Sequence, residues 1–153
     1  VFKLLKASQS QAVYFYCHGV ERDTLPFIRI GAHSSDDYLA PDNLRAYRID
    51  WEQSRPLVFL NGCHTTALTP ERALSFVRSF VEQVGASGVI GTEITIFEPL
   101  AQRFAELFFT RFLEGTPLGR AVREARLGLL AERNPLGLVY IPHAYADLAL
   151  VQK

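Results

Sequence analysis

The stretch Leu57-Val58-Phe59-Leu60-Asn61-Gly62-Cys63 decides the fold of this chain. Its first four residues are all apolar and do not alternate with polar ones. Such an unbroken run is typical of a strand that is buried on both faces of a parallel sheet. In a second segment, Val13-Tyr14-Phe15-Tyr16-Cys17-His18-Gly19, the apolar run stops at a histidine, whereas the first segment ends on a cysteine. We therefore expect two neighbouring parallel strands, at 12–16 and 57–60, each of which stops at a small or polar turn.

The rest of the chain predicts the layers that cover such a sheet. Residues 19–55 are rich in Asp, Ser, Arg and Pro, and we interpret them as an ordered insertion with a hairpin strand at 27–30 and a helical turn at 40–44. After Leu57 the pattern is strand, helix, strand, helix, helix, strand, which predicts an α/β layered sheet. The expected elements are a helix from Thr69-Pro70 to Gly85, a strand at 88–92, a helix at 99–113, a helix opened by Thr116-Pro117, and closing strands at 138–141 and 147–151.

Length and composition limit the class of protein. A chain of 153 residues suits one domain, 1–153, and its net charge of zero gives no reason to expect nucleic acid or an anionic membrane as partner. No apolar stretch approaches the roughly 20 residues that a membrane-spanning helix needs, and the N-terminus does not resemble a signal peptide. Two cysteines in different motifs argue against a disulfide framework and favour a cytoplasmic protein. Because the chain starts at Val1 and contains no methionine, we expect it to be the C-terminal part of a longer protein.

The histidine and the cysteine at the two strand ends form a candidate catalytic pair. Chemistry in open parallel sheets gathers beyond the carboxyl ends of the strands, where His18 and Cys63 are expected to meet. A thiol becomes a nucleophile when a base such as imidazole takes its proton. The glycines beside the pair let a backbone approach substrate closely, and the N–H groups of Gly19 and Cys63 are candidates for an oxyanion hole. The alternative is that Cys63 is a buried cysteine that only fills space.

Zinc binding is an alternative hypothesis for this part of the sequence. Cys17, His18, Cys63 and His64 are all possible ligands. Adjacent residues of a strand point to opposite faces, so four such side chains rarely converge, and the chain has no C-x-x-C spacing. We therefore expect no metal and interpret Cys17 as a core residue.

Four segments stand in a specific order and spacing: 13–19, 39–44 with 57–65, 85–92 with the helix at 99–113, and 114–126. In these segments, and over nearly its whole length, the chain resembles the CHAT domain, a caspase-like cysteine peptidase module of the same clan as caspases, separases, legumains and gingipains. The resemblance implies a caspase-like three-layer αβα sandwich with a mainly parallel sheet, whose first strands lie upstream of Val1. It also implies that Cys63 is the nucleophile, His18 the catalytic histidine and Gly19 the oxyanion-hole glycine, with no cofactor.

Two departures from the family pattern concern the site. Gly62 precedes the cysteine where the family most often has a small residue such as alanine. Residues 93–98 replace a tryptophan motif that many members carry, in a loop that helps to shape the substrate pocket of caspase-like folds. Glu93 and Glu98 are both candidates to line a pocket for a basic side chain, and of the two we assign Glu93 to substrate binding. For Glu98 we favour a position before or in the first turn of the next helix, where a carboxylate interacts favourably with the helix dipole.

These observations predict a cysteine endopeptidase that uses a Cys–His dyad to cleave a protein or peptide substrate. The family often joins this domain to repeat modules, so regulatory repeat domains of the same chain are expected partners. One alternative is a catalytically inactive caspase-fold domain for protein interaction or signalling. Another is a flavodoxin-like binding module with a structural Cys63, which predicts that the two strand ends are not neighbours.

Overall fold

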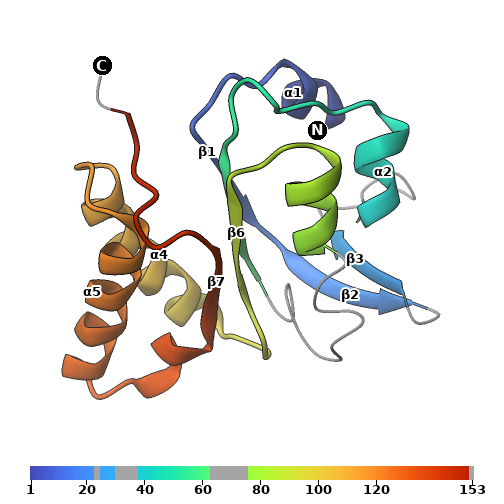
Figure 1. Ribbon diagram of the computed structural model, residues 1–153. Coiled ribbons are helices and arrows are strands. Elements are labelled where there is room, and N and C mark those ends of the chain that lie inside the picture. The colour runs from blue at the N-terminus through green and yellow to red at the C-terminus, as the bar shows by residue number, and fades with distance from the viewer. Residues whose placement is uncertain (23–24, 30–37, 63–75, 152–153) are drawn as a thin grey trace.

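The computed structural model describes residues 1–22, 25–29, 38–62 and 76–151. Its centre is a four-stranded sheet in the order β1-β5-β6-β7 (Figure 1). Strands β1 (Ala12–Tyr16), β5 (Leu57–Asn61) and β6 (Gly88–Thr92) are parallel, and β7 (Tyr140–Ala144) pairs with β6 in the antiparallel direction. All residues of β5 and β6 are buried, as their continuous apolar sequence predicts.

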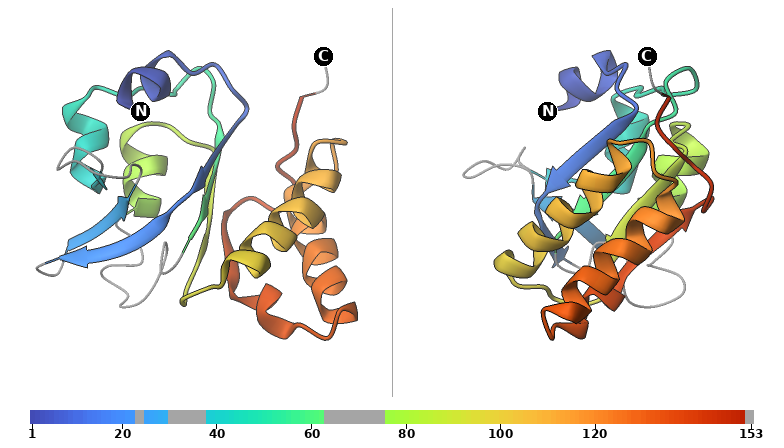
Figure 2. Two further views of the ribbon diagram at one scale, coloured as in Figure 1. Left: turned by 180° about the vertical axis from the view of Figure 1, so that it is seen from behind. Right: turned by 90° about the vertical axis from the view of Figure 1, so that its left-hand side faces the viewer.

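Helices cover both faces of this sheet, so the fold has three layers (Figures 1 and 2). One face carries α4 (Glu98–Phe112) and α5 (Leu118–Ala131), which pack on Phe59 and Ile90. The other face carries α1 (Phe2–Ala7), α2 (Pro41–Ala46) and a helical segment that ends in the π-helix η1 (Ser79–Gln83). Val58 and Leu60 point into this second core because successive side chains of a strand alternate between the faces. The mixed α/β architecture is compatible with the expected caspase-like sandwich.

The insertion after β1 forms a second sheet beside the α2 layer. Strands β2 (His18–Arg22), β3 (Leu25–Arg29) and β4 (Tyr38–Leu39) are antiparallel in the order β2-β3-β4. Ile28 and Leu39 are fully buried and anchor this ribbon on the second core. The predicted turn at His18-Gly19 is therefore wrong, because these two residues begin β2 and pair with Arg29 and Ile28.

The predicted helices are largely confirmed. Helix α4 agrees with the expected 99–113 within one residue at each end. Gly85 has φ of +84°, a backbone conformation that glycine adopts readily, and it follows the end of the η1 helix as expected. The predicted helix start at Thr69-Pro70 lies outside the described residues.

The C-terminal segment differs from the prediction. The 3₁₀-helix η2 (Pro135–Val139) precedes β7, so the closing strand begins at Tyr140 rather than at residue 138. Residues 147–151 do not form the second predicted strand. The carbonyls of Ala146 and Leu148 instead accept hydrogen bonds from the backbone N–H groups of Gly119 (2.8 Å) and Leu118 (2.7 Å). This segment thus caps the start of α5, and Thr116 does not, because Pro117 is the N-cap residue.

Both chain ends lie at the end of the sheet opposite to the carboxyl ends of β1 and β5 (Figure 1). The Gln11 side chain, just before β1, bonds the backbone N–H and carbonyl of Val151 at 2.7 and 3.0 Å. In the described ranges, no helix combines the length and the apolar character that crossing a membrane requires.

Candidate active site at the carboxyl ends of strands β1 and β5

The candidate site lies where the two parallel strands β1 and β5 end. Tyr16 pairs with Asn61 at the last position of their register, and the Cys17 N–H donates to the Asn61 carbonyl at 3.2 Å. His18 follows Tyr16 by two residues, and Cys63 follows Asn61 by the same interval. The strands that lead to the two predicted dyad residues are therefore neighbours and end together. This finding contradicts the flavodoxin-like alternative, which predicted that the strand ends lie apart.

The predicted site residues are described to different extents. His18 and Gly19 are seen as the first backbone positions of β2. Cys63 lies outside the described residues, and so does His64 of the zinc hypothesis. Within the described residues, no group of three or more histidines, cysteines or carboxylates is suited to hold a metal ion. Cys17 is a core residue as predicted, with 7% of its surface exposed.

Asn61 is a buried polar residue that ties β5 to three neighbouring elements. Its side-chain amide donates to the Ala101 carbonyl of α4 (2.8 Å) and to the Tyr14 hydroxyl of β1 (2.7 Å). Its side-chain oxygen accepts the hydroxyl hydrogen bond of Tyr140 on β7 at 2.8 Å. Because a carbonyl can only accept, the bond to Ala101 also defines which amide atom is the nitrogen. Burial raises the pKa of the Tyr14 hydroxyl, and the bond from Asn61 acts in the opposite direction.

The backbone just before Cys63 is held from two further sides. The Thr92 hydroxyl at the end of β6 donates to the Gly62 carbonyl. On the other side, a Cβ atom at Gly62 would lie 2.1 Å from the carbonyl oxygen of Cys17. Asn61, Thr92 and Tyr140 were all missed in the sequence. The only available signal was an asparagine at the end of an otherwise apolar run, and its side-chain partners lie 47 residues upstream and 40 and 79 residues downstream.

Replacing Asn61 with leucine is expected to destabilise the fold by about 3 kcal/mol. The variant would lose the hydrogen bonds of Asn61 to Tyr140, Ala101 and Tyr14, each worth about 1 kcal/mol. Urea unfolding measures the change. The control is Tyr14→Phe, which removes only the partner whose side chain is 42% exposed and should cost less than about 1 kcal/mol. Equal losses in the two variants would contradict a buried network centred on Asn61.

A cavity of about 200 Å³ opens at the ends of β1 and β5. The described residues around it include Tyr16, Cys17, Asn61, Gly62, Ile96 and Glu98. Glu98 is the first residue of α4, as predicted, and also lines this cavity. Glu93 is exposed and is not among its lining residues. Burial lowers the pKa of His143 on β7, and the nearby Glu93 carboxylate offsets only part of this decrease.

Comparison with known proteins shows which family and which relatives the chain is similar to. A family model described as "CHAT domain" matches residues 1–146. A probable protease of Vitiosangium sp. (strain GDMCC 1.1324) is 53% identical over 154 residues, which cover 97% of this chain. The chain spans 20% of the length of that relative. Together the two comparisons indicate a protease-like family.

Proposed function

Because the chain belongs to the CHAT domain family, we propose that it is a cysteine endopeptidase in which Cys63 is the nucleophile and His18 its general base. The observation that carries this proposal is the pairing of β1 with β5, whose register ends at Tyr16 and Asn61. The two strands that precede the proposed imidazole and thiol therefore end side by side. A cavity that Gly62 lines adjoins this edge and offers room for a substrate side chain.

The proposed reaction proceeds by covalent catalysis. His18 takes the proton of the Cys63 thiol, and the thiolate attacks the carbonyl carbon of the scissile peptide bond. The N–H groups of Gly19 and Cys63 donate to the resulting oxyanion. When the intermediate collapses, the C–N bond breaks and protonated His18 gives its proton to the leaving amine. Water, deprotonated by His18, then hydrolyses the thioester, which releases a carboxylic acid and restores the thiol.

The network around Asn61 supports this chemistry by holding the strand that carries the nucleophile. Catalysis requires reacting groups within about 3–3.5 Å of each other, and a displacement of about 1 Å can cost 10²-fold in rate. Bonds from Tyr140 and Thr92 fix the two residues that precede Cys63. Asn61 and Thr92 are positioning residues in this proposal.

Alkylation of the full chain at pH 7 tests the proposal, because the reaction rate of Cys63 can be compared with that of Cys17 in the same sample. An activated thiolate at Cys63 should react with iodoacetamide much faster than Cys17, which is 7% exposed, and peptide cleavage should disappear in step with Cys63 modification. Mass spectrometry assigns the modified residue. Cys63 reacting no faster than an ordinary cysteine, with a pKa of about 8.5, would instead favour the inactive interaction domain.

A further inference from the structure

The cavity beside Gly62 continues into a second one that runs along β1. This second cavity, of about 490 Å³, lies between β1 and α4 and is lined by Tyr14, Tyr16, Glu98, Gln102, Glu106 and Phe109 among others. Tyr16 and Glu98 line both cavities, so the two are adjacent. Because a single water needs only about 10–15 Å³, the first cavity has room for a whole side chain.

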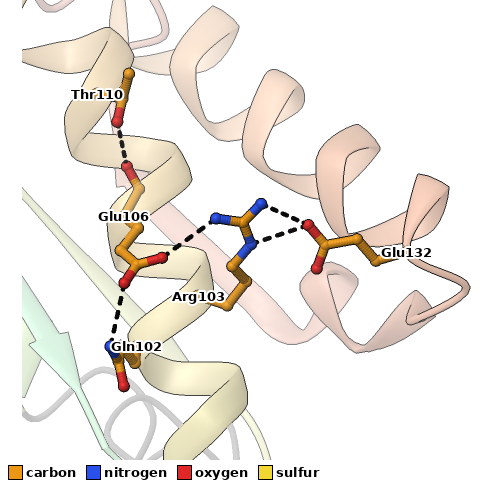
Figure 3. Close-up of polar contacts among 5 residues, drawn as sticks. All are labelled: Gln102, Arg103, Glu106, Thr110 and Glu132. Carbon is orange, nitrogen blue, oxygen red and sulfur yellow. Dashed lines mark hydrogen bonds and ion pairs between the residues drawn. The ribbon is translucent and has the colours of Figure 1, made fainter.

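The two carboxylates of these cavities differ in their surroundings. Glu106 accepts hydrogen bonds from Gln102 (3.1 Å) and Arg103 (3.2 Å), and Arg103 also bridges to Glu132 of the α5 end, as Figure 3 shows. Its charge is therefore compensated within the protein. Glu98 has no ion pair or hydrogen bond among the residues that the structure describes. It is also the carboxylate that lines the cavity next to Gly62.

Aromatic rings complete the surroundings of Glu98. Tyr16 and Tyr14 are 52% and 42% exposed, so both side chains are accessible to a ligand. Both contribute to the cavity along β1. A cation over the face of a tyrosine ring is stabilised by the ring electrons, and more so when water is excluded. An exposed carboxylate without a cationic side-chain partner among the described residues, beside exposed tyrosine rings, therefore matches one ligand chemistry, a cationic side chain with a long apolar stem.

We propose that Glu98 makes the protein select substrates with arginine or lysine at the residue whose carbonyl is attacked. This inference rests on the proposed function, because it identifies the cavity beside Gly62 as the pocket for that residue. The Glu98 carboxylate pairs with the cationic head, and the Tyr16 ring packs beside the stem. The same geometry favours Glu98 over Glu93, the residue assigned to substrate binding from sequence.

The test compares two peptides that differ only in arginine or its neutral isostere citrulline at this position. We expect the full chain to cleave the arginine peptide with the higher kcat/KM, and Glu98→Gln to reduce the arginine-to-citrulline ratio about two- to fivefold, the range for an exposed charge pair. The matched control is Glu106→Gln, which removes a compensated carboxylate from the same helix and should leave the ratio unchanged. An equal ratio in wild type and Glu98→Gln overturns the proposal.

A binding measurement separates this inference from the proposed function. If the wild-type chain cleaves neither peptide, the peptidase proposal fails, but the pocket is still tested by fluorescence anisotropy with the Cys63→Ala variant. Tighter binding of the arginine peptide that is lost in Cys63→Ala/Glu98→Gln supports the role of Glu98. Equal binding of both peptides, or no binding of either, overturns it.

Discussion

Replacing Cys63 with alanine is expected to lower kcat/KM for peptide cleavage by at least about 10³-fold. Alanine cannot form the thioester, and the remaining groups of a triad or dyad give only weak catalysis without their nucleophile. The measurement is steady-state cleavage of a peptide by the full chain, with thermal unfolding to verify that the variant is folded. Cleavage that survives this substitution would contradict the assignment of Cys63.

Two control variants make this result specific to an activated thiol. Cys17→Ala removes the other thiol, which is buried in the core and lines the cavity beside Gly62, so it should lower stability slightly and, because Cys63 remains, reduce cleavage far less than Cys63→Ala. His18→Ala should lose cleavage almost as completely as Cys63→Ala at pH 7. Because an unassisted thiol ionises near its ordinary pKa of about 8.5, raising the pH through that value should restore alkylation of Cys63 in this variant but not cleavage, since the leaving amine still lacks its proton donor. Cleavage that recovers together with alkylation would indicate that His18 only removes the thiol proton.

The helices and strands that could be predicted are those whose hydrophobic pattern lies within one continuous stretch of sequence. The apolar runs of β5 and β6 and the three- to four-residue spacing of apolar side chains in α4 and α5 each belong to a single element. These patterns arise because the side chains that face the core must be apolar, so the pattern is visible in the residues of the element itself. Residues 147–151 carry an apolar pattern too, with Leu148 and Leu150 packed on the first core. The backbone carbonyls of this region accept hydrogen bonds from the first N–H groups of α5. The need for these acceptors arises in α5, so the sequence of residues 147–151 does not reveal it.

The same distinction separates the predicted and the missed parts of the site. The meeting of two strand ends follows from the rule that parallel strands share a carboxyl edge, so it could be predicted that β1 and β5 end together, two residues before His18 and Cys63. The role of Asn61 and the proposed preference for Glu98 over Glu93 could not. Asn61 depends on partners in β1, α4 and β7, and Glu98 depends on a cavity that β1, β5 and α4 form together. Glu93 and Glu98 look alike in sequence, and only their surroundings distinguish them.

Gly62 is one of the positions where this chain departs from the family pattern. The family most often has a residue such as alanine before the cysteine, so an alanine here would look harmless. In this chain a Cβ at Gly62 would lie 2.1 Å from the Cys17 carbonyl oxygen and 2.9 Å from its carbonyl carbon. These are backbone atoms of the neighbouring strand, which cannot rotate away as a flexible side chain does. Gly62→Ala must therefore push the ends of β1 and β5 apart.

We expect Gly62→Ala to destabilise the fold by about 1–3 kcal/mol, the usual cost of overpacking, and to lower kcat/KM about 10²-fold. The loss in activity should exceed what unfolding explains, because the displaced strand ends carry His18 and Cys63. Urea unfolding and peptide cleavage on the same preparation separate the two effects. Gly128→Ala in α5 is the control, since its new methyl group would meet only the end of the Leu107 side chain, at 3.0 Å. If both variants keep full activity, the close approach of Cys17 and Gly62 does not position the nucleophile.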